Sequence, residues 1–147
     1  MIEVRRSLEV PHPAARMYAL VDRIEDYPSF LPWCLATTVK RGPGQQVAAT
    51  MQVGKGMLRH EFATANIHDP EQLTIAIELV RGPFSFLRGN WQFTEMETGS
   101  RVDFVLEYEF ASGVVGRMFA PLFSAAYGRM IDSFAQQAAR LDSAAAT

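Results

Sequence analysis

Apolar and polar residues alternate in two segments, and Arg6 is the one break in the pattern of the first. Residues 2–10 and 102–110 both show the period of two that is expected of a strand with one buried face. Between them, further apolar runs are separated by turns rich in Gly, Pro and Asp, at intervals of about 8 to 14 residues. The pattern predicts an antiparallel meander, with strands at about 2–10, 33–40, 45–53, 57–67, 73–79, 86–95 and 102–110.

Helical periodicity occurs in two other places. A short helix is expected at about 13–22, followed at 26–33 by a proline-rich loop or helical turn. Residues 113–141 carry a much longer amphipathic pattern, whose apolar positions are three or four residues apart. At roughly 1.5 Å per residue such a helix is about 40 Å long. Pro121 lies inside the pattern and predicts a kink or a new helix start near Ala120.

The order of these elements predicts an α+β fold in which a curved antiparallel sheet of six to seven strands wraps around a long C-terminal helix, with two short helices after the first strand. One face of the sheet needs a cover, and the terminal helix is the only long apolar helix available. An all-β barrel is the weaker alternative, because it leaves that helix without a partner. The chain has 147 residues, of which 48% are apolar, so we expect one domain over 1–147 with an ordered core at about 2–141.

Charge argues against nucleic acid as a partner. The formal net charge is −2, so no general positive field attracts phosphate, and no DNA partner is expected. A local basic patch would have to come from residues such as Arg81, Arg88, Arg117 and Arg129. The single cysteine, the absence of a signal-peptide pattern and the absence of a long apolar run together predict a cytoplasmic protein. Peripheral contact with the inner membrane is the alternative.

The sequence shows few features of an enzyme. The three histidines, His12, His60 and His68, are too far apart for a zinc motif, and no nucleophile elbow is present. We therefore expect no catalytic residues and no metal site. Cys34 is expected to be a small core residue.

Two polar segments are candidates for a functional role. Residues 59–61, Arg-His-Glu, lie on a predicted strand, and one of them could face inward and anchor a ligand. The acidic run of Asp22, Glu25 and Asp26 is more typical of a solvated helix end than of a catalytic site.

Alternate connections of an up-and-down meander lie at the same end of the sheet. The loops at 54–56, at 81–85 and after residue 110 therefore share one end with Trp33, and that end is unusually apolar. Exposed apolar surface costs about 25 cal/mol per Å². Two interpretations remain open: the loops cap the core, or they form a hydrophobic mouth that admits an apolar ligand.

The alternation of apolar residues along the strands and the end of the sheet at which each connection lies together give the candidate ligand-binding residues. They are large apolar side chains from the proline-rich segment, the inner faces of the strands and the terminal helix: Tyr27, Phe30, Trp33, Met51, Phe84, Phe86, Trp91, Phe93, Leu106, Tyr108, Phe119, Phe123, Met130 and Phe134.

Three motifs resemble a known family. They are YALV at 18–21 with IEDYPSFLPWC at 24–34, GPF at 82–84 with LRGNWQF at 87–93, and RMIDSF at 129–134. Together they resemble the coenzyme Q-binding and ribosome association toxin (RatA) branch of the START-like, helix-grip superfamily, which includes polyketide cyclases/dehydrases. The resemblance extends from about residue 5 to residue 141. It implies a cavity between the curved sheet and the long C-terminal helix.

The resemblance implies two activities, because one fold hosts several. Mitochondrial-type members bind a polyisoprenoid quinone and support respiration as carriers or chaperones, without a catalytic step. Members described as toxins associate with the large ribosomal subunit. We expect a non-enzymatic lipid carrier whose ligand is ubiquinone or a related isoprenoid quinone, bound without a covalent link, with the ring near the mouth and the tail along the helix. The alternatives are a ribosome-associated translation inhibitor and an aromatase/cyclase-type enzyme, for which a convincing acid/base set is missing.

Overall fold

A single antiparallel sheet organises the computed structural model, which describes residues 1–146. Within these residues the sheet has seven strands: β1 (Ile2–Val10), β2 (Cys34–Arg41), β3 (Gln46–Lys55), β4 (Leu58–Asp69), β5 (Thr74–Arg81), β6 (Phe84–Met96) and β7 (Gly99–Phe110). Their order is β1-β7-β6-β5-β4-β3-β2, so β2 to β7 form a meander and β1 pairs with β7. The predicted sheet is confirmed.

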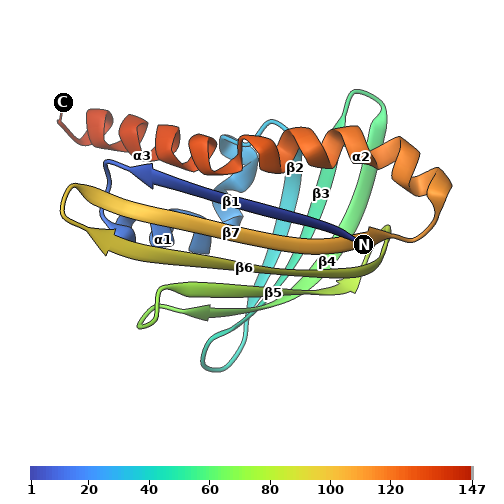
Figure 1. The fold of residues 1–147 in the computed structure, drawn as a ribbon, viewed down its shortest axis with the longest axis horizontal. Helices are drawn as coiled ribbons and strands as arrows, with labels where there is room; N and C mark the ends of the chain where they lie inside the picture. Colours follow the sequence, from blue (N-terminus) through green and yellow to red (C-terminus); the bar gives the residue numbers. More distant parts are fainter. Residues whose placement is uncertain (147) are drawn as a thin grey trace.

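Four helical elements accompany the sheet within the part of the chain that the structure describes. Helix α1 (Ala14–Asp22) and the 3₁₀ helix η1 (Ile24–Ser29) connect β1 to β2, as predicted, while α2 (Gly113–Gly128) and α3 (Met130–Ala146) follow β7. Figure 1 shows α2 and α3 lying end to end along the sheet, with β2 to β4 rising behind them and α1 beneath α3. The sheet therefore grips the C-terminal helices, and the barrel alternative is excluded.

No new helix starts near Ala120, which was one of the two outcomes predicted from Pro121. Helix α2 runs through Pro121, and the break comes at Arg129, whose φ of −121° and ψ of 11° leave the helical region. Pro121 is exposed, so water can reach the helix carbonyl that the missing proline N–H leaves free. The chain breaks instead beside Gly128, a residue of low helix propensity. Helix α3 then continues to Ala146, beyond the predicted end at residue 141.

The centre of the core lies where α3 meets the sheet. Phe134 is only 1% exposed, and its ring makes edge contacts with Tyr27 and Phe30 at 5.3 Å and with Trp91 at 5.8 Å between ring centroids. Such edge-to-face pairs stabilise beyond their buried area. The predicted apolar face of the terminal helix is buried except at Met130, which is partly exposed, and at Leu141, which is 41% exposed.

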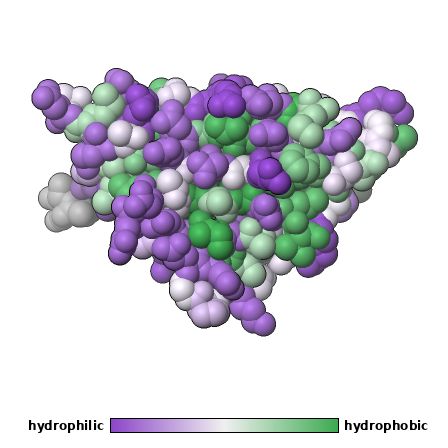
Figure 2. Space-filling model, turned by 60° about the horizontal axis from the view of Figure 1, so that its bottom comes forward, coloured by the Kyte–Doolittle hydropathy of each residue, from purple (hydrophilic) through white to green (hydrophobic). Residues whose placement is uncertain are grey.

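The antiparallel register places the β3–β4, β5–β6 and β7–α2 connections at one end of the sheet, together with the start of β2. This agrees with the prediction that alternate connections of the meander share one end. Four apolar side chains in or next to these connections remain exposed: Met57 (98%), Val80 (61%), Val114 (58%) and Met118 (52%). Hydrophobic residues also gather toward the right of the face in Figure 2, the side on which Figure 1 places the β5–β6 and β7–α2 connections. We call this end of the molecule the apolar end.

Candidate functional site

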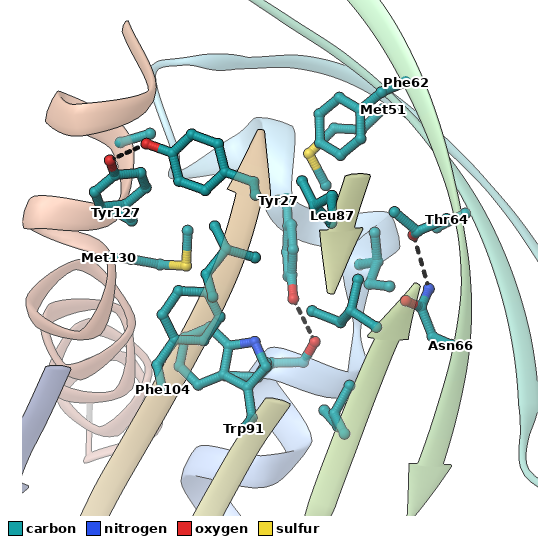
Figure 3. Close-up of a pocket in the computed structure, with 18 of the residues that line it drawn as sticks. Tyr27, Met51, Phe62, Thr64, Asn66, Leu87, Trp91, Phe104, Tyr127 and Met130 are labelled. Atoms are coloured by element: carbon teal, nitrogen blue, oxygen red, sulfur yellow. Dashed lines mark hydrogen bonds between the residues drawn. The ribbon is translucent and has the colours of Figure 1, made fainter. Parts of the chain in front are cut away.

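A cavity of about 120 Å³ lies between the C-terminal helices and the inner face of the sheet. Figure 3 shows Tyr127 and Met130 reaching into it from the helices, Thr64 and Asn66 facing them from β4, and Trp91 and Phe104 below. The walls are almost entirely apolar. The arrangement fits a small-molecule site, which is typically a concave apolar pocket with a few polar groups.

Most of the predicted ligand-binding residues line this cavity. They come from η1, the following segment, β3, β6, β7, α2 and α3: Tyr27, Trp33, Met51, Phe84, Trp91, Leu106, Tyr108, Phe123 and Met130. Alternation found them because each strand side chain among them points to the concave face. Trp33, Met51 and Met130 keep partial solvent exposure, as does Phe62 on β4, so solvent approaches the cavity beside these residues.

Five predicted residues do not line it. Phe30 and Phe134 fill the core by contacting each other, with ring centroids 5.3 Å apart. Phe93 points inward but packs edge-on against Tyr18 of α1 at 5.7 Å, so α1 separates it from the cavity. Alternation along a strand assigns a side chain to one face of the sheet. It does not reveal which part of that face is already covered by another element.

Phe86 and Phe119, the other two predicted residues that do not line the cavity, lie elsewhere for local reasons. A register shift between Phe84 and Phe86 inverts the alternation, so Phe84 and Leu87 line the cavity while Phe86 lies beneath the Arg88 guanidinium, 5.5 Å from the ring centroid. Phe119 is buried near the apolar end, against the ring of His60 at 5.3 Å.

Strand β4 supplies polar residues that the sequence analysis missed. Thr64, Asn66 and His68 are buried, with exposures of 8%, 4% and 4%, and they line the cavity in alternation with the exposed Ala65 and Ile67. The prediction ended this strand at 67 and read His68 as part of a turn, whereas β4 continues to Asp69. The alternation of Phe62 with these three positions was the signal that could have found them.

The rest of the lining was also missed. It consists mainly of aliphatic and aromatic residues around the predicted set: Val21, Ile24, Ala49, Phe62, Ile75, Ile77, Leu87, Phe104, Ala126 and Tyr127. Arg59, His60 and Glu61, which were considered as ligand anchors, do not line the cavity. All three are exposed, and Glu61 forms an ion pair with Arg81 at 2.8 Å.

A hydrogen-bonded network with charged side chains holds His68 in place. Its Nδ1 lies 2.6 Å from Oδ1 of Asp22, at the end of α1, and Arg41 Nη1 lies 3.4 Å from the same oxygen. Arg41 Nη2 also contacts Glu25 Oε1 at 3.0 Å, which lowers the pKa of Glu25. Asp22 is therefore a structural partner rather than part of a purely solvated run.

Burial lowers the pKa of His68, and this effect exceeds the opposing attraction of Asp22. The imidazole is consequently neutral at pH 7. Because a carboxylate only accepts hydrogen bonds, Nδ1 carries the proton and donates it to Asp22. The other ring nitrogen, Nε2, is left with a free lone pair.

The tyrosine hydroxyls of the cavity wall all take part in hydrogen bonds within the protein, and in the pair of Tyr108 and Tyr127 one of the two O–H hydrogens stays available. Tyr27 donates to the carbonyl oxygen of Val21 at 2.5 Å, and the hydroxyls of Tyr108 and Tyr127 are hydrogen-bonded to each other. Burial raises the pKa of Tyr27 and of Tyr108, so both stay protonated. These groups stiffen the wall and do not offer a charge to a ligand.

The site offers little nucleophilic or metal chemistry. Burial raises the pKa of the Cys34 thiol to about 12, and Cys34 does not line the cavity. Within residues 1–146 no group of three or more His, Cys, Asp and Glu side chains could hold a metal ion. The described chain also contains no helix with the length and apolarity needed to cross a bilayer.

A curved antiparallel sheet that grips C-terminal helices around an apolar cavity defines the START-like class of proteins. The chain belongs to the family described as polyketide cyclase / dehydrase and lipid transport, which matches residues 10–135.

Individual relatives agree with this assignment. The chain is 35% identical to the ribosome association toxin RatA of Pseudomonas aeruginosa over 94% of this chain and 96% of the relative. It is 28% identical to the mitochondrial coenzyme Q-binding protein coq10 of Schizosaccharomyces pombe, over 91% and 85% of the two chains. The resemblance found in the sequence motifs is confirmed.

Two solved structures share the fold. An 18 kDa protein of Caulobacter crescentus is 31% identical, with a TM-score of 0.79 over 97% of this chain and 99% of the other. An aromatase/cyclase of Streptomyces, ZhuI, superimposes with a TM-score of 0.82 over 95% of this chain and 94% of the other. Because the two sequences are only 13% identical, this likeness supports the fold assignment alone.

Proposed function

We propose that this protein binds and carries a hydrophobic small molecule with a ring-shaped head and an apolar tail, ubiquinone or a related isoprenoid quinone, without transforming it. The supporting observation is the apolar cavity between the helices and the sheet. The name of the coq10 relative adds support for a quinone. Burying an isoprenoid tail contributes about 0.8 kcal/mol per CH₂ group, which favours an apolar enclosure.

The volume of the cavity limits how much of such a ligand it holds. At about 120 Å³ it is smaller than the 300–1,000 Å³ pockets that enclose whole drug-sized ligands. A ring-sized head fits the dimensions of the site, whereas a long tail must extend past the partly exposed residues at its edge. The protein thus shields the head and the first part of the tail.

Both tryptophans of the chain, Trp33 and Trp91, line the cavity, so their fluorescence reports its occupancy. Decylubiquinone, a short-chain quinone, should quench this fluorescence in a saturable manner. The variant Ala126→Leu places a larger side chain in the cavity and should weaken binding at least about tenfold, because the wall cannot take up extra volume freely.

The matched control is Ala125→Leu, one position away on the exposed side of α2, which should bind as the unmodified protein does. Equal affinity in both variants would place the quinone elsewhere. Mass spectrometry of lipids extracted from protein purified from its native host identifies the ligand itself. Failure to recover or load any quinone contradicts the proposal.

We also propose that the apolar end contacts a membrane surface when the ligand is exchanged. Met57 and Met118 are exposed there, and the cations Lys55, Arg59 and Arg117 lie nearby in the chain, which suits an anionic lipid surface. The double variant Met57→Asp with Met118→Asp should float less with vesicles of phosphatidylcholine and phosphatidylglycerol. Met96→Asp, at the other end of the sheet, should not change flotation.

Association with the large ribosomal subunit is the second candidate, favoured by the 35% identity to RatA. Two of the four arginines considered for a basic patch are paired: Arg81 with Glu61 at 2.8 Å and Arg88 with Glu78 at 3.7 Å. Co-sedimentation with isolated large subunits tests this function. If Ala126→Leu loses quinone and still co-sediments, the two activities are separate.

A further inference from the structure

Thr64, Asn66 and His68 form a polar group within an otherwise apolar cavity, and we call them the polar end. All three project from β4, and Figure 3 shows Thr64 and Asn66 on the wall opposite the helices. Neither capping of the core nor the apolar tail of a lipid requires polar groups here. Buried polar side chains lower stability unless they find partners, so their presence needs a reason.

Two atoms of the polar end lack a hydrogen-bond partner among residues 1–146: Asn66 Oδ1 and His68 Nε2. The amide nitrogen of Asn66 donates to Thr64 Oγ1 at 3.1 Å, which leaves the amide oxygen free. Nδ1 of His68 is engaged with Asp22 at 2.6 Å, which leaves Nε2 free. Both atoms belong to side chains that are 4% exposed.

Both free atoms are hydrogen-bond acceptors. The amide oxygen is an acceptor by nature, and Nε2 is an acceptor because the proton of the neutral ring is held on Nδ1 by the Asp22 carboxylate. The charged groups around the imidazole are Asp22 from α1, Glu25 from η1 and Arg41 from β2, and burial lowers the pKa of His68 in spite of the two carboxylates. The Thr64 hydroxyl still has an O–H to donate, but the two atoms of the polar end without any partner are both acceptors, so a ligand that donates is complementary to them.

We propose that the polar end binds hydroxyl groups on the head of the ligand, which donate hydrogen bonds to His68 Nε2 and Asn66 Oδ1, so that the protein prefers the reduced, quinol form of its ligand. A quinone offers only carbonyl acceptors and leaves both protein atoms unpaired, whereas a quinol supplies two O–H donors. The inference rests on the proposed function. It also places the ring at the polar end, which reverses the sequence-based expectation of a ring near the mouth.

The test compares three head groups on one decyl chain, under anaerobic conditions at pH 7.5 and by calorimetry: decylubiquinol, decylubiquinone and the dimethyl ether of decylubiquinol. The ether keeps the ring and the tail but cannot donate. We expect the quinol to bind about tenfold more tightly than either of the other two. This measurement needs only the unmodified protein, so it does not depend on a variant that folds.

The variant His68→Phe removes the acceptor and keeps a ring of similar size. It should lose the preference for the quinol and bind the quinone at least as well as before. His60→Phe, on the exposed end of the same strand, is the control and should keep the preference.

The outcomes separate this inference from the proposed function. Equal binding of the three compounds overturns the donor-selective head site and leaves the carrier function standing. A preference for the quinone also overturns it. If none of the three compounds binds, the proposed function itself fails.

Discussion

His68 links the polar end to the stability of the fold through its protonation. Burial depresses the pKa of the folded imidazole below its ordinary value of 6.5. Between that depressed value and 6.5, the unfolded chain binds a proton that the folded protein does not bind. The stability contributed by neutral His68 is therefore complete above pH 6.5 and is lost as the pH falls through this window.

Urea unfolding at pH 7.5 and pH 5.5 measures this contribution. We expect the free energy of unfolding to be lower at pH 5.5, and we expect His68→Phe to reduce the difference between the two values. Carboxylates titrate mostly below this range, at pKa values near 4. An unchanged pH dependence in His68→Phe would show that other groups cause the loss.

Phe134 should be among the most costly side chains to truncate. It is 1% exposed and its ring contacts Tyr27, Phe30 and Trp91. Phe134→Ala should lower the free energy of unfolding by about 3–5 kcal/mol, because the side chains around it can collapse only in part. Phe86→Ala, on the outer face, should cost much less in the same urea titration. Similar losses in both variants would contradict this account of the core.

Residue by residue, the sequence predicted apolar contacts better than polar ones. Trp91, Leu106 and Tyr108 were found because large apolar residues in alternation nearly always face a core. Asn66 and His68 were missed because polar residues are usually exposed, and their inward direction depends on where β4 ends. The pairing of His68 with Asp22 joins residues that are far apart in the chain, and no local pattern encodes it.

At the scale of elements, the junction between α2 and α3 offers a position for a stabilising substitution. Gly128 has nothing within 4 Å of the position that a Cβ atom would occupy. Gly128→Ala should raise stability by about 0.5–1 kcal/mol through higher helix propensity and a less flexible unfolded chain. Thermal unfolding followed by circular dichroism measures the change.

Gly56→Ala is the matched comparison, since its surroundings are equally open but its φ is +64°. Alanine is strained in that conformation, so this variant should lower stability. A gain in both variants would mean that backbone conformation does not decide the outcome.

Element types followed from periodicity, but irregularities within elements did not. The strands and the helices around 14–22 and 113–146 were each expected close to where they lie. The register shift at Phe84 and Phe86 and the helix break at Arg129 were not foreseen. A periodic pattern contains neither a bulge in a strand nor the exact residue at which a helix ends. The first of them moved Phe86 from the cavity to the outer face.

At the scale of the whole molecule, ligand binding should stabilise the protein by mass action. The cavity wall draws on helices and strands from both halves of the chain, so unfolding abolishes the site. Decylubiquinone at 100 times its dissociation constant should add about 2.7 kcal/mol to the free energy of unfolding. The melting temperature should rise with quinone concentration for the unmodified protein and for Ala125→Leu. A rise of equal size in Ala126→Leu would indicate binding outside the cavity.

The pairing of β1 with β7 joins the first strand of the chain to the last, with Ile2 opposite Tyr108. While the protein is being synthesised, β2 to β6 can each meet a neighbour soon after it leaves the exit tunnel. The first strand must wait, with its edge exposed, until β7 has appeared. Completion of the sheet is thus a late event of biogenesis, and a chain truncated before residue 99 leaves its N-terminal strand available for mispairing or for capture by a chaperone.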